Sequence, residues 1–184
     1  DTTDYIEIAT VGNALDFGNL SANRNFLCGL SNPTRAIAAG GRQPAYVATI
    51  EFFIIASKGD ATDFGDLTEI RRSLAPATSS TRGVMSNGTT PNDSGLRTID
   101  YITMASAGNA INFGDSTISI ENRTGLTNTT RGVFAGGLDN PTRTNVIDYV
   151  TIASAGDAID FGDLSVPRRA GGGASDSHGG LGGF

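Results

Sequence analysis

One phrase occurs four times along this chain of 184 residues, and its spacing limits the folds that the chain can adopt. Residues 99–115 and 147–163 are identical at 13 of 17 aligned positions, and looser copies cover residues 4–19 and 50–66. Successive copies of the Phe-Gly pair in this phrase lie 47, 49 and 48 residues apart. A period of this length is typical of a propeller, a solenoid or another repeat array.

The repeat divides the chain into units of about 48 residues, and we expect them to form a single domain over residues 1–184. The last complete cycle contains four strand-sized segments, at residues 123–128, 131–137, 146–154 and 157–164. Bulky side chains occupy both faces of the third segment, which indicates a sheet that is covered on both sides. Four strands in about 48 residues is the size of a propeller blade. The units are residues 4–49, 50–98, 99–146 and 147–184.

Each unit also carries glycine and aromatic residues at recurring spacings. An apolar segment ends in a double glycine (residues 131–137, RGVFAGG), Tyr149 follows it, and Phe161 and the sequence VPRR precede a glycine-rich segment. This pattern resembles the kelch repeat. The kelch family has Trp at the position of Phe161, whereas this chain contains no Trp, and its second unit has Asn87-Gly88 in place of the double glycine. The resemblance covers the whole chain and implies an all-β, kelch-like propeller of four blades.

The phrase VTIASAGDAIDFGDL at residues 150–164 is also similar to repeat segments of virion and tail-fibre proteins of aquatic bacteriophages. This resemblance implies a non-enzymatic structural or adhesive module of an extracellular assembly, such as a virion fibre or a surface filament. The alternative is a lectin-like propeller that binds a glycan on one face. The loops at residues 89–95 and 138–144 contain no aromatic residue on which a sugar could stack, which favours the structural interpretation.

The repeat pattern begins and ends within a unit. The chain opens on a third strand at residues 4–9 and closes after a second strand at residues 180–184, so one blade is split between the two ends. We expect residues 179–183 to pair with residues 5–9, because unpaired strand edges promote aggregation. Pairing within one chain would close a ring, whereas pairing between chains would produce a filament or a closed oligomer. Partners are then other copies of the chain or other structural proteins.

Composition excludes several kinds of partner and chemistry. The net charge is −6 and Lys58 is the only lysine, so the chain lacks the clustered cations that bind nucleic acid. Mean hydropathy is −0.11, and no apolar run approaches the ~20 residues of a membrane-spanning helix. A single cysteine and a single histidine exclude an internal disulfide, a cysteine-rich metal site and the copper site of kelch-type oxidases. We expect no cofactor and no membrane insertion.

Three arginines recur at the same place in successive units, after turns such as SNPTR and TNTTR: Arg35, Arg82 and Arg131. Blade symmetry would arrange them around one face of a propeller. Guanidinium groups in such a ring could bind an anion or an acidic glycan, which makes these residues the candidate ligand-binding site. The alternative is that each arginine pairs with a group of the neighbouring blade.

Asp and Asn side chains recur at intervals of three residues after the third strand of each unit. Oxygen ligands at such close spacing suit Ca²⁺. Asx side chains that cap their own turns explain the same residues without a metal, and this is the interpretation that we adopt. The triplets are Asn13/Asp16/Asn19, Asp60/Asp63/Asp66, Asn109/Asn112/Asp115 and Asp157/Asp160/Asp163.

The remaining reactive side chains predict no catalysis. His178 stands where the other units have arginine, and Ser175, Asp176 and Ser177 precede it, but neighbours in sequence do not form the geometry of a catalytic triad. Cys28 lies in an apolar run and is expected to be a small core residue.

Five Asn-x-Ser/Thr sequons are possible glycosylation sites if the chain is secreted by a cell that glycosylates. They lie at Asn19, Asn87, Asn92, Asn122 and Asn128.

The strongest strands carry aromatic residues in register. We expect Tyr101, Phe113, Tyr149 and Phe161 to be largely buried between blades. Truncation of Phe161 to Ala should then cost about 3–5 kcal/mol.

Overall fold

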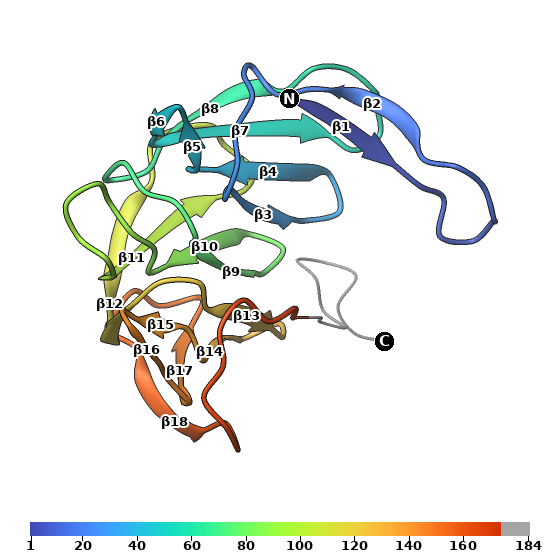
Figure 1. The fold of residues 1–184 in the computed structure, drawn as a ribbon. Helices are drawn as coiled ribbons and strands as arrows, with labels where there is room; N and C mark the ends of the chain where they lie inside the picture. Colours follow the sequence, from blue (N-terminus) through green and yellow to red (C-terminus); the bar gives the residue numbers. More distant parts are fainter. Residues whose placement is uncertain (174–184) are drawn as a thin grey trace.

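The computed structural model describes residues 1–173, and within them the chain is all-β, with antiparallel sheets and no helix. Three four-stranded sheets follow one another along the chain (Figure 1). Sheet I contains β3 (Cys28–Ser31), β4 (Arg35–Ala39), β7 (Thr49–Ile54) and β8 (Thr62–Asp66). Sheet II contains β9 (Ala75–Thr78), β10 (Arg82–Ser86), β11 (Leu96–Thr103) and β12 (Ile111–Ile120). Sheet III contains β13 (Thr124–Thr127), β14 (Arg131–Ala135), β17 (Val146–Thr151) and β18 (Ile159–Asp163).

Three two-stranded hairpins complete the described part of the chain. The N-terminal hairpin pairs β1 (Thr2–Tyr5) with β2 (Leu15–Asn19). Two small hairpins interrupt sheets I and III after the second strand, and they consist of β5 (Arg42–Gln43) with β6 (Ala45–Tyr46) and of β15 (Leu138–Asp139) with β16 (Thr142–Arg143). The strand order agrees with the four segments expected in each unit, and it places β1 and β2 as the third and fourth strands of an earlier unit. The opening third strand spans Thr2–Tyr5, so its expected position at residues 4–9 is wrong.

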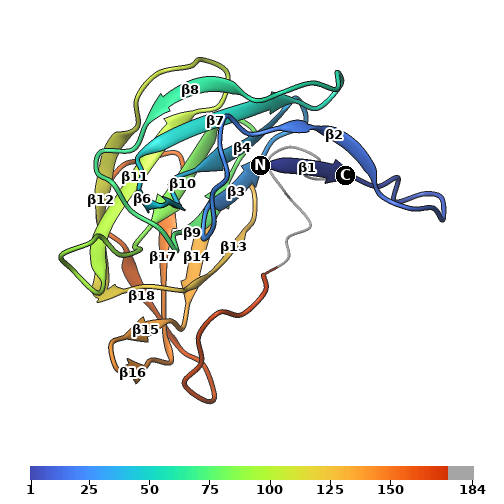
Figure 2. The ribbon, with the colours of Figure 1, turned by 45° about the horizontal axis from the view of Figure 1, so that its top comes forward.

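The sheets lie one after another around an open arc. In Figure 1 the N-terminal hairpin and sheet I lie at the top, sheet II lies in the middle and sheet III lies at the bottom. The first strand of each sheet is innermost and the fourth is outermost, and Figure 2 shows the same order after a turn of 45°. The N-terminal hairpin and β18 stand apart in both views. The strand pairing that was expected for residues 179–183 lies outside the described residues.

The turn after each second strand requires a left-handed backbone, which explains the repeated glycines. Gly40 and Gly136 have φ values of 61° and 62° at these turns. Asn87 takes the same conformation at 61° in sheet II, because Asn tolerates this region better than other residues with a Cβ atom. The double glycine of the sequence pattern is therefore a backbone requirement that Asn87 also meets.

Apolar side chains from adjacent sheets form the core between them. One cluster joins Phe64 of sheet I to Ile102 and Met104 of sheet II, and a second joins Phe113 of sheet II to Val150 and Ile152 of sheet III. The clusters explain why both faces of the third strand are bulky in sheet II, since this sheet is covered by a neighbour on either side.

The expected burial of the repeated aromatics holds at Phe113, which is 3% exposed, and is wrong at Phe161, which is 54% exposed. Tyr101 and Tyr149 are half-buried, and each meets its phenylalanine edge to face. The difference has a positional cause, because Phe113 is covered by sheet III, whereas Phe161 lies on the last described sheet. The predicted cost of 3–5 kcal/mol therefore belongs to Phe113 and not to Phe161.

Candidate functional site

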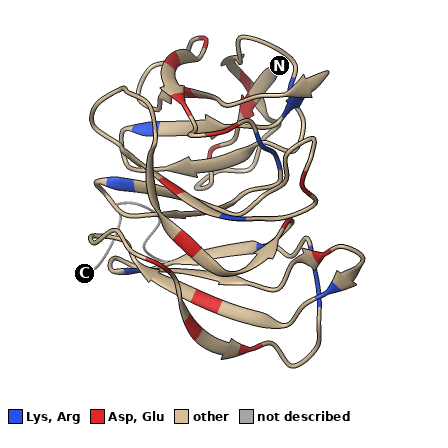
Figure 3. Ribbon diagram, turned by 90° about the vertical axis from the view of Figure 1, so that its left-hand side faces the viewer, with Lys and Arg blue, Asp and Glu red and all other residues tan. Residues whose placement is uncertain are grey.

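The junctions between successive sheets contain most of the repeated polar side chains, so we treat these junctions as the candidate functional site. The described chain has three of them: hairpin to sheet I, sheet I to sheet II, and sheet II to sheet III. Figure 3 shows acidic residues recurring from sheet to sheet along the arc. The same contacts recur at each junction and come from corresponding residues of each unit.

A backbone contact between loop and strand is the first repeated feature. At the junction of sheets II and III, the Gly156 N–H donates to the carbonyl of Phe113 at 2.7 Å, and the Ala158 N–H donates to the carbonyl of Asp115 at 2.8 Å. The Asp157 carboxylate accepts the Asp115 N–H at 2.9 Å. Corresponding bonds form at the other junctions, where the acceptor side chains are Asp60 and Asn109.

The Asp and Asn triplets therefore have a role that differs from the expected one. In the three triplets that follow another unit, the first member (Asp60, Asn109 or Asp157) links two sheets, because its side chain accepts an N–H from the previous unit. Among residues 1–173, no group of three His, Cys, Asp or Glu side chains is arranged to hold a metal ion. The expectation that the triplets act without calcium stays a prediction.

A close approach of two backbones accompanies these bonds. A Cβ atom added at Gly114 would lie 2.4 Å from the Gly156 carbonyl oxygen, and one added at Gly65 would lie 2.6 Å from Gly108. Gly18 makes the corresponding approach to Gly59. The glycine of the Phe-Gly pair is thus needed wherever another unit follows, since any side chain would separate the two sheets.

A buried carboxylate on the third strand is the second repeated feature. In sheet II, Asp100 is fully buried and accepts bonds from the Thr68 hydroxyl at 2.7 Å and from the Thr68 N–H at 3.0 Å. Arg71 pairs with the same carboxylate at 2.7 Å. Thr68 and Arg71 lie in the linker between sheets I and II, so Asp100 clamps the incoming linker to its sheet.

The same clamp occurs in the other sheets with small changes. Asp148 of sheet III accepts the Thr117 hydroxyl at 2.7 Å and pairs with Arg123 at 2.7 Å. Burial lowers the pKa of Arg123, and the charge of Asp148 opposes this shift. Glu51 of sheet I accepts the Ser21 N–H at 3.0 Å and pairs with Arg24.

Two of the three candidate ligand-binding arginines are engaged in the junctions. Arg35 stacks on Phe52, 4.6 Å from the ring centroid, and donates to the carbonyl of Met104 in the next sheet at 2.8 Å. Arg82 stacks on Tyr101 and donates to the carbonyl of Ile152 at 3.1 Å.

The third arginine differs in its surroundings. Arg131 stacks on Tyr149 and is exposed, because no sheet follows sheet III among residues 1–173. The three arginines thus occupy corresponding positions, as the repeat predicts, and each of the first two reaches one sheet further along the arc.

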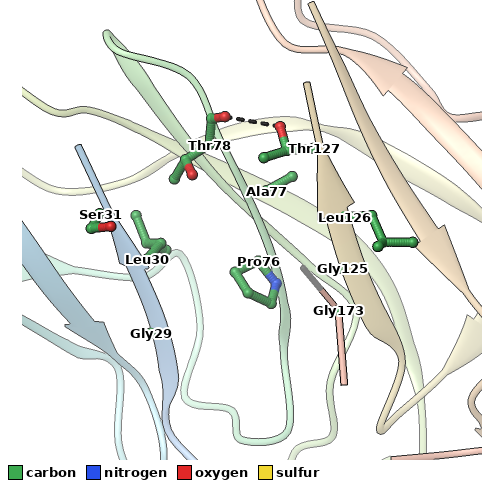
Figure 4. Close-up of a pocket in the computed structure, with 10 residues that line it drawn as sticks. All are labelled: Gly29, Leu30, Ser31, Pro76, Ala77, Thr78, Gly125, Leu126, Thr127 and Gly173. Carbon is green, nitrogen blue, oxygen red and sulfur yellow. Dashed lines mark hydrogen bonds between the residues drawn. The ribbon is translucent and has the colours of Figure 1, made fainter. Parts of the chain in front are cut away.

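The innermost strands surround a small central cavity of about 200 Å³ (Figure 4). Figure 4 shows the residues that line it, which come from β3, β9 and β13, together with Gly173. Thr127 donates to the carbonyl of Thr78 across the cavity at 2.9 Å. The cavity is a place where inner strands approach one another, and its lining residues carry no charge.

The five sequons lie in different surroundings. Asn87 is fully buried, and its amide nitrogen donates to the carbonyl of Leu96 and the hydroxyl of Ser116, so a glycan cannot be attached to it without opening the core. Asn19, Asn92 and Asn128 are exposed, and Asn122 is partly buried with a φ value of 56°.

Of the two remaining reactive residues, Cys28 lies within the described part of the chain. Cys28 is 3% exposed and belongs to the core, as expected from its apolar neighbours. Burial raises the pKa of its thiol to about 12, and the nearby charge of Arg71 lowers it to a smaller extent. His178 lies outside the described residues. Within residues 1–173, no helix has the length and apolar character needed to cross a membrane.

Sequence reasoning missed the carboxylate clamp. Its signal was present in the phrase itself, where an acidic residue occupies the same place in each third strand: Asp4, Glu51, Asp100 and Asp148. In the last three of these copies the acidic residue directly follows an isoleucine. An acidic residue on a strand with bulky residues on both faces must be paired if it is buried. A Ser or Thr with Arg three residues later precedes two of these strands, in the linkers that contain Arg24 and Arg71. A comparison with protein-family models and with curated proteins finds no match for this chain.

Proposed function

We propose that this chain is a non-enzymatic structural or adhesive module of an extracellular assembly, such as a virion fibre or a surface filament. In this proposal sheets I to III are blades of a kelch-like propeller, and a fourth blade is split between the two ends of the chain. The observation that carries the proposal is the use of the repeated polar side chains. Asp100, Asp148, Arg35 and Arg82 hold sheets and linkers together, as described above.

This use of polar residues supports a mechanical role. A binding or catalytic protein needs polar groups that converge on a concave site and remain available to a ligand. Here the repeated groups bond to neighbouring carbonyls and carboxylates, which stabilises the order of the units instead. Buried charges that are paired in this way fix one arrangement of the units, because a shifted arrangement would leave an unpaired charge in the core.

The test of the structural proposal is the location of the protein in its source material. Antibody against residues 1–184 should label particles or filaments in the extracellular fraction after density-gradient separation. A signal found only in the soluble contents of lysed cells would contradict the proposal.

The alternative function is a lectin-like propeller, and the exposed guanidinium of Arg131 is the observation that favours it. A glycan array that includes acidic sugars separates the two functions. The structural proposal expects no retained glycan. The lectin alternative expects binding that an Arg131→Ala variant loses and an Arg143→Ala variant, with a different exposed arginine, retains.

A further inference from the structure

The two ends of the described chain carry the two halves of one more junction. Three junctions repeat the same bonds, and the residues that would form a fourth set are present but lie apart (Figure 1). On sheet III these residues are Phe161, Gly162 and Asp163. On the N-terminal hairpin they are Gly12, Asn13 and Ala14, which correspond to Gly156, Asp157 and Ala158 in the junction of sheets II and III.

Both halves of this junction are open in the described structure. Gly114 meets the next loop closely, whereas a Cβ atom at the corresponding Gly162 would have nothing within 4 Å. On the hairpin, Gly12 corresponds to Gly59 and Gly156, whose N–H groups donate to the carbonyls of Phe17 and Phe113. No sheet precedes Gly12 in the described chain to accept the corresponding bond. Two close-packing surfaces of the repeat therefore face solvent in the described structure.

The carboxylate clamp is divided in the same way. Asp4 occupies the position of Asp100 and Asp148 on its strand, but it is exposed. Ser165 and Arg168 occupy the positions of Thr68 and Arg71 in the linker after sheet III, and both are exposed. One end of the chain thus holds a carboxylate without its linker, and the other end holds a linker without its carboxylate.

Apolar side chains follow the same division. Ile6 is 64% exposed and Ile8 is 96% exposed, whereas their counterparts Val150 and Ile152 are nearly fully buried against Phe113. Phe161, which corresponds to Phe113, is 54% exposed on the other half. The two exposed surfaces are therefore complementary. The hairpin presents a carboxylate and apolar side chains, and the sheet III end presents the linker arginine and an exposed phenylalanine that would cover them.

The residues after sheet III have already taken the first positions of a further unit. The Gly137 N–H donates to the carbonyl of Arg168 at 2.8 Å, as Gly88 does to Ile120 one unit earlier. Ala170 is left-handed, with a φ value of 53°, like the corresponding residue of each earlier unit, and its N–H donates to the carbonyl of Asn122 at 2.9 Å.

The N-terminal hairpin presents the matching cavity. Because β1 and β2 hold the third and fourth positions of a unit, a cavity of about 450 Å³ lies between β1 and sheet I, on the side where the first two strands of that unit belong. It is lined by Thr2, Thr3 and Asp4 on one side and by Ile37 and Phe53 on the other.

We propose that the sheet III end of one molecule docks onto the N-terminal hairpin of a second copy, in the arrangement of the three internal junctions. We assign a second copy as the partner for the following reason. The three internal junctions are fully bonded while the hairpin and sheet III lie apart, so bringing these two ends together within one chain would require the internal junctions to rearrange. A second copy meets the same surfaces without any such change. Head-to-tail contacts of this kind propagate unless the rotation closes. The inference rests on the split unit of the proposed function and assigns its partner.

Blocked ends test the docking in solution. Ala14→Arg blocks the hairpin end, since the corresponding Ala110 and Ala158 are covered in their junctions. Arg168→Glu blocks the sheet III end by placing a negative charge opposite Asp4. In sedimentation velocity, the unmodified protein should form a concentration-dependent series, and each variant alone should remain monomeric. An equal mixture of the two variants should form a pair and stop there, because each partner keeps one competent end.

Matched controls carry the same charge changes beside the junction. Leu15→Arg alters a position that is exposed on the hairpin and at its counterparts Ile111 and Ile159. Arg169→Glu alters a position whose counterparts are Asn25, Arg72 and Glu121, so the junction accepts either charge there. Both controls should associate like the unmodified protein.

Two outcomes would overturn the docking of a second copy. One is an unmodified protein that stays monomeric at every concentration, with a mixture of blocked variants that forms no pair. The other is a thermal midpoint that falls in both blocked variants under dilute, monomeric conditions, which would show that the ends meet within one chain. Either result would leave the structural-module proposal standing, because that proposal is tested by location and glycan binding.

Discussion

At the scale of single residues, burial decides what each repeated side chain does. Asp100 and Asp148 are fully buried and paired, whereas Asp4 has the same place in the phrase and is exposed. A buried charge without its partner is strongly unfavourable, and an exposed one is hydrated at little cost. The repeated phrase therefore encodes a clamp whose energy depends on whether a linker is present to complete it.

The clamp of sheet II predicts a large loss of stability when one partner is removed. Arg71→Met should lower the free energy of unfolding by about 3–5 kcal/mol, because it leaves the Asp100 carboxylate buried and unpaired. Chemical denaturation measures this change. Arg169→Met is the matched control on an exposed arginine and should change the free energy by about 0.5 kcal/mol or less. An equal effect of both substitutions would contradict the clamp.

Cys28 predicts a dependence of stability on high pH. Burial raises the pKa of its thiol from the ordinary value of 9.0 to about 12 in the folded protein, so the folded state disfavours the thiolate. This contribution is complete below pH 9.0 and is lost as the pH rises toward 12. The difference in unfolding free energy between the unmodified protein and Cys28→Ala should therefore shrink by about 1.4 kcal/mol per pH unit in this interval.

Thiol reactivity provides an independent check of the same residue. The native protein should react with a thiol reagent only after it unfolds, since a buried thiol is protonated and inaccessible. Rapid modification of the native protein at neutral pH would contradict the burial of Cys28.

At the scale of elements, the same strand has different surroundings at different places in the arc. β12 and β18 carry the same Phe-Gly pair, but sheet III covers β12 and no described sheet covers β18. The contribution of a repeated residue to the free energy of unfolding thus depends on whether a neighbouring sheet covers it. Substitutions at corresponding positions of β12 and β18 measure this contribution directly.

Phenylalanine truncation compares a covered element with an uncovered one. Phe113→Ala should destabilise the protein by about 3–5 kcal/mol, because it removes a buried ring from the cluster between sheets II and III. Phe161→Ala should cost about 1 kcal/mol, the range of one exposed aromatic pair. Thermal or chemical unfolding of the two variants under dilute conditions distinguishes these values. Equal costs would show that β18 is covered.

The glycines of the same pair isolate the close approach of the backbones. Gly114→Ala and Gly162→Ala both place a side chain at positive φ, 150° and 135°, so both carry a similar backbone strain. Only the first creates an overlap, with the Gly156 carbonyl oxygen 2.4 Å from the new Cβ atom. Gly114→Ala should therefore destabilise the monomer by about 2 kcal/mol more than Gly162→Ala, measured by chemical denaturation. A difference near zero would contradict the contact.

At the scale of the whole molecule, stability is distributed along a line of similar junctions. The junctions described above join each unit to the next one along the chain, which is typical of repeat architectures. The inner strands add a chain of bonds between left-handed residues, from Ala170 to Asn122, from Asn122 to Ser73 and from Ser73 to Phe26. Such a molecule has two different end surfaces, and its association with other molecules depends on which surface each end contacts.

Metal removal is a prediction at this scale, because the Asp and Asn triplets recur in every unit. The junctions use Asp60, Asn109 and Asp157 as hydrogen-bond acceptors, so the sheets stay together without a bridging ion. Addition of EDTA should leave the thermal midpoint of unfolding unchanged. A fall of several degrees that calcium reverses would show that the triplets bind the ion.

The sequence by itself determined the all-β class, the four strands of each unit and the positions of the repeated glycine pairs. These features are local, since strand pattern and turn chemistry depend on residues close together in the chain. The spacing of the phrase also placed the arginines at corresponding positions. The identity of the elements could therefore be read from the repeat alone.

Only the tertiary structure decided which copies of the phrase are buried and which remain open. Identical residues such as Phe113 and Phe161, or Asp100 and Asp4, have opposite exposure because one neighbouring sheet is present or absent. The tertiary structure also decides which arginine pairs with each buried carboxylate. Arg71 pairs with Asp100, whereas Arg123 pairs with Asp148 from a different position in its linker. Burial and pairing depend on contacts between units. Copies of a repeat have the same sequence whether or not a neighbouring unit covers them, so the sequence alone does not distinguish a covered copy from an open one.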